Sequence, residues 1–198
     1  SDNGVAGFIL ANGALSGGGE EYKIRRKLIE NNLVEAILVL PRNLFYTTDI
    51  SVTLWIVNKN KKAQEKKVGD ETRKYRNREK EILFMDLRQM GEPFEKKYTQ
   101  FSDADIKKVT STYHQWQKKK IENVPEFCYS ASINEVAKKD FSLVPSKYIE
   151  FVNRDENIDF DEKMKTLQGE FAELLKAEAD SKKKLLKVFK ELGYEIKL

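Results

Sequence analysis

Two short segments carry side chains that are suited to holding a flat ligand. Asn12 and Gly13 directly follow an apolar run, Val5–Ala11, and Phe45 and Tyr46 follow the next apolar run along the chain. In open α/β sheets, ligands bind at the carboxyl ends of parallel strands, where we expect both segments to lie. Adjacent aromatic rings at such an edge can stack on a base turned out of a duplex. The alternative is that Phe45 or Tyr46 only covers the core.

The sequence contains no complete catalytic motif of a common kind. It lacks a P-loop, a GxGxxG fingerprint and a nucleophile elbow, and one histidine with one cysteine cannot build a Cys/His zinc site. The three glycines at 17–19 precede a predicted helix and could hold an anion through backbone N–H groups, although a flexible loop is the simpler interpretation. His114 lies off the apolar stripe of its helix, and Cys128 is expected to be a small core residue. We therefore expect no metal site.

The composition indicates a folded protein with much solvated helix. Of 198 residues, 40% are hydrophobic and 11% aromatic, which is enough for a core, while the charged fraction of 34% is high. No apolar run approaches the roughly 20 residues that span a bilayer, so we expect no membrane association. A single cysteine excludes an internal disulfide and is typical of a reducing compartment, so a cytoplasmic location is expected.

The elements that would position the candidate residues begin with a strand, a helix and a second strand. Val5–Ala11 and residues 34–40 are predicted to be buried strands, joined by a helix over 20–32, as in a parallel βαβ unit. The run at 50–57 follows too closely for a crossover helix and should pair antiparallel. A fourth run at 81–87 is predicted to be an edge strand. The predicted fold class is α/β.

A basic segment at 59–80 interrupts this pattern. It contains ten Lys or Arg and four Asp or Glu, so its net charge of +6 exceeds the +4 of the whole chain. One interpretation is a loop that contacts a phosphate backbone, and the other is a solvated hairpin connection. The candidate phosphate contacts are Lys61, Lys62, Lys66, Lys67, Arg73 and Lys74.

The remaining sequence divides into two further regions. Residues 1–92 are assigned to the α/β domain, 93–158 to a helix and linker that pack on it, and 159–198 to an amphipathic helical region. The helix after Ser102 is predicted from that N-cap and its acidic first turn. In 159–198, apolar residues occupy the a and d positions of a heptad repeat, except at Glu178 and Ser181. The apolar positions are Met164, Leu167, Phe171, Leu174, Leu185, Val188 and Leu192. This apolar stripe could pack on the protein's own α/β domain or dock with the helices of a partner, and the sequence pattern does not decide between them.

Taken in order, these segments resemble a known family. The resemblance is to the modification subunit of type I restriction–modification systems, an N6-adenine DNA methyltransferase. The chain is similar to the second, trailing half of that Rossmann-like sheet, including its antiparallel hairpin. The segments that carry the resemblance are 4–13 (GVAGFILANG), 17–19 (GGG) with 24–29 (IRRKLI), 38–41 (LVLP), 44–55 (LFYTTDISVTLW), 85–88 (MDLR) and 141–148 (FSLVPSKY).

The resemblance implies an activity together with a set of partners. The family transfers a methyl group from S-adenosylmethionine to adenine in DNA, and it works with specificity and restriction subunits. Its methyl-donor loop and Asn-Pro-Pro-aromatic motif lie upstream of the first strand, and no Asn-Pro-Pro occurs here. We therefore expect the N-terminal half of the protein to complete the site and this chain alone to be inactive, with no catalytic residue assigned. Phe45 and Tyr46 would face the target adenine, with Asn12 and Gly13 at the pocket edge, although Ala11 replaces a common proline.

Two functions of different classes follow. The first is DNA methylation at adenine N6 as part of a type I modification subunit. The second is a non-catalytic interaction module, which presents the C-terminal helix to a specificity subunit or another partner; the resemblance favours this docking role for 159–198. A nonspecific DNA binder that uses 59–80 is a third, weaker alternative.

Overall fold

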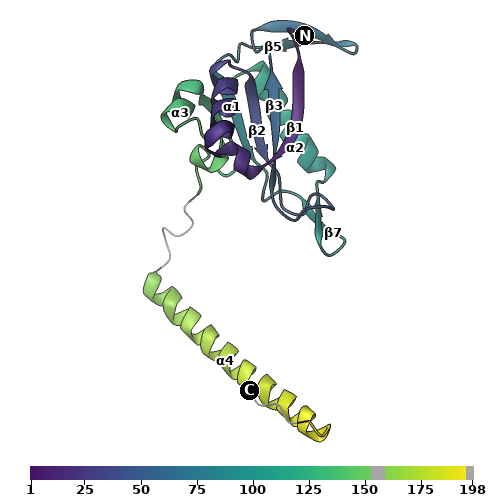
Figure 1. Ribbon diagram of the computed structural model, residues 1–198, viewed down its shortest axis with the longest axis vertical. Helices are drawn as coiled ribbons and strands as arrows, with labels where there is room; N and C mark the ends of the chain where they lie inside the picture. Colours follow the sequence, from purple (N-terminus) through teal and green to yellow (C-terminus); the bar gives the residue numbers. More distant parts are fainter. Residues whose placement is uncertain (153–158, 195–198) are drawn as a thin grey trace. The chain divides into compact units, whose positions relative to one another are not determined.

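A mixed five-stranded sheet is the centre of the computed structural model, which describes residues 1–152 and 159–194 (Figure 1). The strand order is β1-β3-β2-β6-β9. β2 and β6 are parallel, and the other neighbouring strands are antiparallel. The strands are β1 (Val5–Ala11), β2 (Val34–Val39), β3 (Val52–Asn58), β6 (Glu81–Asp86) and β9 (Cys128–Ser132).

The third strand lies between the first two. Helix α1 (Gly19–Glu30) joins β1 to β2, and both strands pair antiparallel with β3. The predicted antiparallel pairing of this run is therefore confirmed. β1 and β2 point the same way, as expected of a βαβ unit, but they are separated by β3 and do not hydrogen-bond to each other.

The burial of β1 differs from the prediction. All of its residues are exposed, whereas every residue of β2 is buried. The strand pairs only through β3, and no described strand pairs with its other edge. Its contacts with the rest of the sheet include Phe8, whose ring stacks on Trp55 with centroids 6.0 Å apart. An apolar run identifies a strand, but its burial depends on what lies beside it.

The run at 81–87 is central and not at the sheet edge as predicted. β6 is buried from Ile82 onward, because β9 pairs with its outer side. Cys128–Ser132 lies within the predicted helix and linker region, 93–158, where no strand was expected. Only the pairing partner reveals it as a strand.

Two apolar clusters cover the two faces of the sheet. On one face, Leu15, Ile29 of α1 and Val136 of α3 (Ile133–Lys138) pack over β2 and β6. On the other face, Trp116 of α2 (Asp103–Lys118) packs over the alternate residues of the same strands. The predicted start of α2 is confirmed, because Ser102 and Asp105 form a capping box.

Two hairpins lie at opposite ends of the sheet (Figure 1). The hairpin of β4 (Gln64–Val68) and β5 (Glu71–Tyr75) connects the end of β3 to the start of β6. The hairpin of β7 (Glu92–Phe94) and β8 (Tyr98–Gln100) follows the carboxyl end of β6. The basic segment 59–80 is therefore an ordered hairpin with its flanks.

A buried carboxylate anchors this basic hairpin. The pairing of β2 with β3 is irregular between Val34 and Ala36, and the extra residue of this bulge is Glu35, which is fully buried. Its carboxylate accepts hydrogen bonds from Arg78 Nε at 3.0 Å and Asn58 Nδ2 at 2.5 Å. Gln117 Nε2 of α2 is 3.4 Å away. One side chain thus connects β2, β3, α2 and the base of the hairpin.

The helix α4 (Phe160–Glu191) belongs to a second unit, 153–198, and is described by itself. It is one continuous helix with Asp159 as its N-cap, so Glu178 and Ser181 do not break it. The seven predicted stripe residues are between 39% and 67% exposed. Parts of the predicted regions, 153–158 and 195–198, lie outside the described residues. In the described part of the chain, no helix is long and apolar enough to span a membrane.

Removing the charge of Glu35 is expected to destabilise the first unit strongly. Glu35→Gln leaves the Arg78 guanidinium buried without its counter-charge, which costs about 3 kcal/mol of unfolding free energy. Urea denaturation at pH 7 measures the loss. The control is Glu30→Gln, which breaks the exposed pair with Arg26 and should leave the denaturation midpoint unchanged. Equal midpoints for the two variants would contradict the anchoring role.

Candidate functional site

A cavity of about 340 Å³ opens at the carboxyl ends of the parallel strands. It lies where β1, β2 and β6 end, next to the 3₁₀ helices η1 (Asn12–Leu15) and η2 (Pro145–Lys147). Its volume falls in the range of small-ligand pockets. The lining residues are Asn12, Gly13, Leu15, Ser16, Val39, Arg88, Val144, Pro145 and Ser146.

Asn12 and Gly13, which directly follow β1, line this cavity. Leu15 anchors their turn in the core, and its carbonyl oxygen accepts a hydrogen bond from the backbone N–H of Leu143 at 2.9 Å. The carbonyl oxygen of Gly13 accepts from Ser16 and Gly17 N–H groups. The polar edge of the cavity is therefore carried by a turn that is fixed on both sides.

A buried arginine holds this turn in place, and the sequence analysis did not single it out. Arg25 of α1 donates from Nη1 to the carbonyl oxygens of Ala14 at 3.1 Å and Gly17 at 2.9 Å, and from Nε to that of Phe141 at 2.9 Å. Burial lowers the pKa of its guanidinium. The sequence gives no signal for this burial, because Arg25 is one of three consecutive cations between Ile24 and Leu28.

The acidic first turn of α1 disfavours an anion at the three-glycine loop. α1 begins at Gly19, and its first turn contains Glu20 and Glu21. These carboxylates occupy the positive end of the helix dipole, which an anion would otherwise use. A Cβ at Gly17 would meet the end of the flexible Glu21 side chain, which could move aside, and would lie 3.1 Å from the carbonyl oxygen of Gly13.

Phe45 and Tyr46 lie at the same end of the sheet but on its other face. Phe45 is half-buried and packs on the cluster around Trp116, whereas the turn of Asn12 packs through Leu15 on the opposite cluster. Tyr46 is 72% exposed and makes an edge-to-face contact with Tyr98 of β8, with ring centroids 4.7 Å apart. Neither aromatic residue lines the cavity. The predicted residues Asn12 and Gly13 are therefore separated from Phe45 and Tyr46 at the carboxyl edge of the sheet.

Arg88 is the charged residue of the cavity, and it too was missed as a site residue. Its Nε lies 2.9 Å and its Nη2 2.5 Å from oxygens of Asp86, the last residue of β6. Asp86 is 8% exposed, and the hydrogen bond to it raises the pKa of Arg88. The segment 85–88 contributed to the family resemblance, but its pattern alone gives no role.

The basic hairpin lies away from the cavity, at the end of the sheet where β6 begins. A seven-residue strand spans roughly 20 Å, which is the separation between the two ends. Lys62, Lys67 and Lys74 are exposed, Lys66 and Arg73 are half-buried, and Lys74 pairs with Glu65 at 2.9 Å.

Lys61 corrects the predicted set of phosphate contacts. It is 1% exposed, and its ammonium donates to the carbonyl oxygens of Val34 and Glu81, each at 2.9 Å. Its burial lowers its pKa from 10.5 to about 8. Lys61 is therefore part of the base of the hairpin and does not offer its charge to a ligand. A lysine in a basic run gives no sequence signal for this burial.

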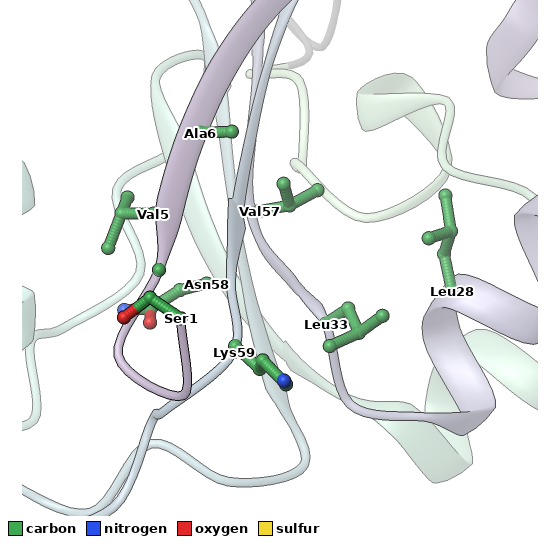
Figure 2. A pocket seen from close by; sticks show the side chains of 9 residues that line it. Ser1, Val5, Ala6, Leu28, Leu33, Val57, Asn58 and Lys59 are labelled. Atoms are coloured by element: carbon green, nitrogen blue, oxygen red, sulfur yellow. The ribbon is translucent and has the colours of Figure 1, made fainter.

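A second hollow, of about 320 Å³, lies at the start of β1 (Figure 2). Its walls are mainly apolar. Val5, Ala6 and Val57 come from the strands, and Leu28 and Leu33 come from α1 and the turn after it. The hollow therefore lies between the exposed strand β1 and the end of α1.

Comparison with protein families decides the classification. The model of the N-6 DNA methylase family matches residues 1–157. The chain belongs to this family. The predicted resemblance to type I methylase subunits is thereby confirmed at the level of the family and its named members.

The methylase relatives match nearly the whole chain. The type I restriction enzyme HindI methylase subunit of Haemophilus influenzae is 35% identical over 98% of this chain and 41% of its own length. The type I restriction enzyme MjaIX methylase subunit of Methanocaldococcus jannaschii is 31% identical over 97% of this chain and 33% of its own length. The methylase chain thus spans less than half the length of these relatives.

A solved structure matches the fold of this methylase chain. The methyltransferase subunit of a type I restriction–modification system from Streptococcus thermophilus superposes with a TM-score of 0.61 at 27% identity. The match covers 76% of this chain and 27% of that subunit. The mixed α/β sheet is therefore a shared feature of the methyltransferase subunit and this chain.

The buried Lys61 predicts a pH dependence of stability. Because its pKa is lowered in the folded state, the unfolded chain binds more protons between pH 8 and 10.5, and this group's contribution to stability rises with pH in that window. Below pH 8 both states are protonated and the contribution is constant. In urea unfolding, the free energy of unfolding of the wild type should rise relative to that of Lys61→Gln between pH 8 and pH 10. A pH-independent difference between the two proteins would contradict the burial of this ammonium.

Proposed function

We propose that this chain is part of an adenine-N6 DNA methyltransferase of a type I restriction–modification system. The observation that carries the proposal is the cavity at the carboxyl ends of the sheet, in a chain of the N-6 DNA methylase family. Ligands of open α/β sheets bind in this position. The sheet order supports the Rossmann-like assignment, since β3 is an antiparallel strand beside the parallel β1 and β2.

The target adenine would lie between the two faces of this edge. Tyr46 presents an exposed ring, which Tyr98 holds from the side, and Phe45 closes the core behind it. Asn12 and Gly13 would form the opposite wall. A base that is turned out of the duplex is bound by such stacking together with polar contacts to its edge.

The methyl donor would be S-adenosylmethionine, but its site is not assigned to this chain. Dinucleotide and nucleoside sites of α/β sheets use an acidic side chain to hold ribose hydroxyls. The cavity residues include no Asp or Glu. The residues present therefore do not fit the donor, and we place its binding in the part of the protein upstream of β1.

The same upstream part would cover β1. The exposed strand, its unpaired edge in the described chain and the apolar hollow of Figure 2 are one continuous surface. Pairing a further strand with β1 and packing a helix over Val5 and Val57 would bury them. We infer that this surface is internal in the intact protein.

Contact between the basic hairpin and DNA is a separate proposal. Lys62, Lys66, Lys67, Arg73 and Lys74 remain as candidates for phosphate contacts after the burial of Lys61. Because the hairpin is roughly 20 Å from the cavity edge, it would touch DNA away from the target base. Each lost phosphate contact would reduce, by about one, the slope of the logarithm of the DNA-binding constant against the logarithm of the salt concentration.

Tyr46 is expected to support methyl transfer through its ring. In the intact subunit with its specificity subunit, Tyr46→Leu should lower kcat/KM for target DNA roughly tenfold, as expected for a lost stacking contact. Tyr46→Phe keeps the ring and should retain activity, which separates stacking from loss of the hydroxyl. Radiolabelled methyl transfer measures both. Equal activity of the Leu and Phe variants, or robust transfer by the 198-residue chain alone, would count against the proposal.

A second candidate function is partner docking through α4. It is favoured by the exposure of all seven stripe residues on one continuous helix. An apolar stripe of that length is typical of a helix that packs against other helices. In the type I family that this chain resembles, the partner would be the specificity subunit, with the restriction subunit joining the assembly.

Docking through α4 is tested by placing charges on the stripe. Phe171→Asp and Leu185→Asp should abolish co-elution with the specificity subunit, since each puts a carboxylate into an apolar seam. Ala172→Asp and Ala179→Asp add the same charges on the outer face of the same helix and should leave co-elution intact. Unchanged assembly of the stripe variants would exclude this docking role.

A further inference from the structure

The geometry points to Arg88 as the residue that binds a phosphate of the DNA strand at the cavity edge. This inference rests on the proposed methyltransferase function and adds a phosphate-binding residue to it. The side chain of Arg88, which follows β6, lines the cavity together with Asn12 and Gly13, which follow β1. Arginine is the side chain best suited to phosphate, since its planar fork matches two phosphate oxygens.

The guanidinium of Arg88 is fixed before any ligand arrives. Nε of Arg88 is 2.9 Å from Asp86 Oδ1 and 3.1 Å from Oδ2, and Nη2 is 2.5 Å from Oδ2. The backbone N–H of Arg88 also donates to Oδ1 at 3.1 Å. Asp86 is more than nine-tenths buried at the end of β6, whereas the side chain of Arg88 is 47% exposed. A buried carboxylate therefore orients a cation toward an open cavity.

The pairing leaves part of the fork available. Asp86 occupies Nε and Nη2, and within residues 1–152 and 159–194 no hydrogen bond is made by Nη1. The two N–H groups of Nη1 are therefore donors for a ligand. Preorganised donors of this kind bind more tightly, because no side-chain entropy is lost on binding.

The hydrogen-bond donors around Arg88 suit an anion. The polar lining residues are Asn12, Ser16, Arg88 and Ser146, so the cavity has one cation and no lining carboxylate. The carboxylate closest in sequence, Asp86, is already bound to Arg88 itself. Amide and hydroxyl groups are further donors to phosphate oxygens. A ligand without acceptor atoms would leave the Nη1 group of Arg88 without a hydrogen-bond partner in the cavity.

The position at the strand ends relates this phosphate to the target base. Arg88 follows β6 and Asn12 follows β1, with Val39 of β2 between them in the lining. Phe45, the neighbour of Tyr46 in the chain, packs on the other face of the same edge. A nucleotide whose base is turned toward this edge carries its phosphates beside it, within the reach of a side chain in the cavity. Phosphate contacts of this kind fix position and carry no sequence information.

The test compares Arg88→Gln with a matched arginine in the intact subunit assembled with its specificity subunit. Arg26 is the control, because it also pairs with a carboxylate and its side chain is 49% exposed, but it lies outside the cavity on α1. Arg88→Gln should raise the DNA KM roughly tenfold and lower the salt slope of DNA binding by about one, while the KM for S-adenosylmethionine stays unchanged. Arg26→Gln should change none of these.

Two further variants separate phosphate binding from folding. Arg88→Lys keeps the charge without the fork and should recover part of the DNA affinity. Asp86→Asn should weaken DNA binding with an unchanged salt slope, because Arg88 keeps its charge but loses its fixed orientation. Thermal unfolding of each variant checks that the fold is kept. An unchanged DNA KM in a folded Arg88→Gln protein, or a rise in the KM for S-adenosylmethionine instead, overturns the inference; an inactive wild-type assembly overturns the proposed function.

Discussion

The buried carboxylate of Glu35 is the constraint on which the arrangement of the first unit depends. A charge in the centre of a sheet is tolerated only when it is paired and hydrogen-bonded, and here Arg78, Asn58 and Gln117 satisfy it. The partners come from β3, from α2 and from the segment between β5 and β6, which are distant from Glu35 in sequence. The bulge in β2 turns this side chain toward the α2 face, so strand register and helix position are fixed together.

This network also changes the meaning of the basic segment. Of its ten cations, Lys61 and Arg78 are buried, and Arg76 pairs with Glu81 while its guanidinium packs on the Trp116 ring. Formal charge therefore overstates what the hairpin offers to a partner. The remaining exposed lysines project from a structure that is held at its base, which differs from a free solvated loop.

The carboxyl edge of the sheet has a different construction. Its loops are positioned by backbone hydrogen bonds to buried arginine and by apolar anchors such as Leu15, and its polar side chains stay exposed. The edge is also open on one side, since in the described chain β1 pairs with β3 and no strand pairs with its outer side. A site at this edge is open on the β1 side, which agrees with a chain that covers less than half of its methylase relatives.

The sequence by itself determined the local elements and the family. Apolar runs identified β1, β2, β3 and β6, and the Ser102 cap identified α2, because these signals depend on neighbouring residues only. Segments in the right order and at sensible spacing were enough to recognise the family, and the position of Asn12 followed from the strand before it. The tertiary structure decided whatever depends on distant partners. It placed β3 between β1 and β2, made Cys128–Ser132 a strand, buried Lys61, and set Arg88 against Asp86 in a cavity. No local pattern encodes these outcomes, since burial and pairing are properties of two segments that meet only in the fold.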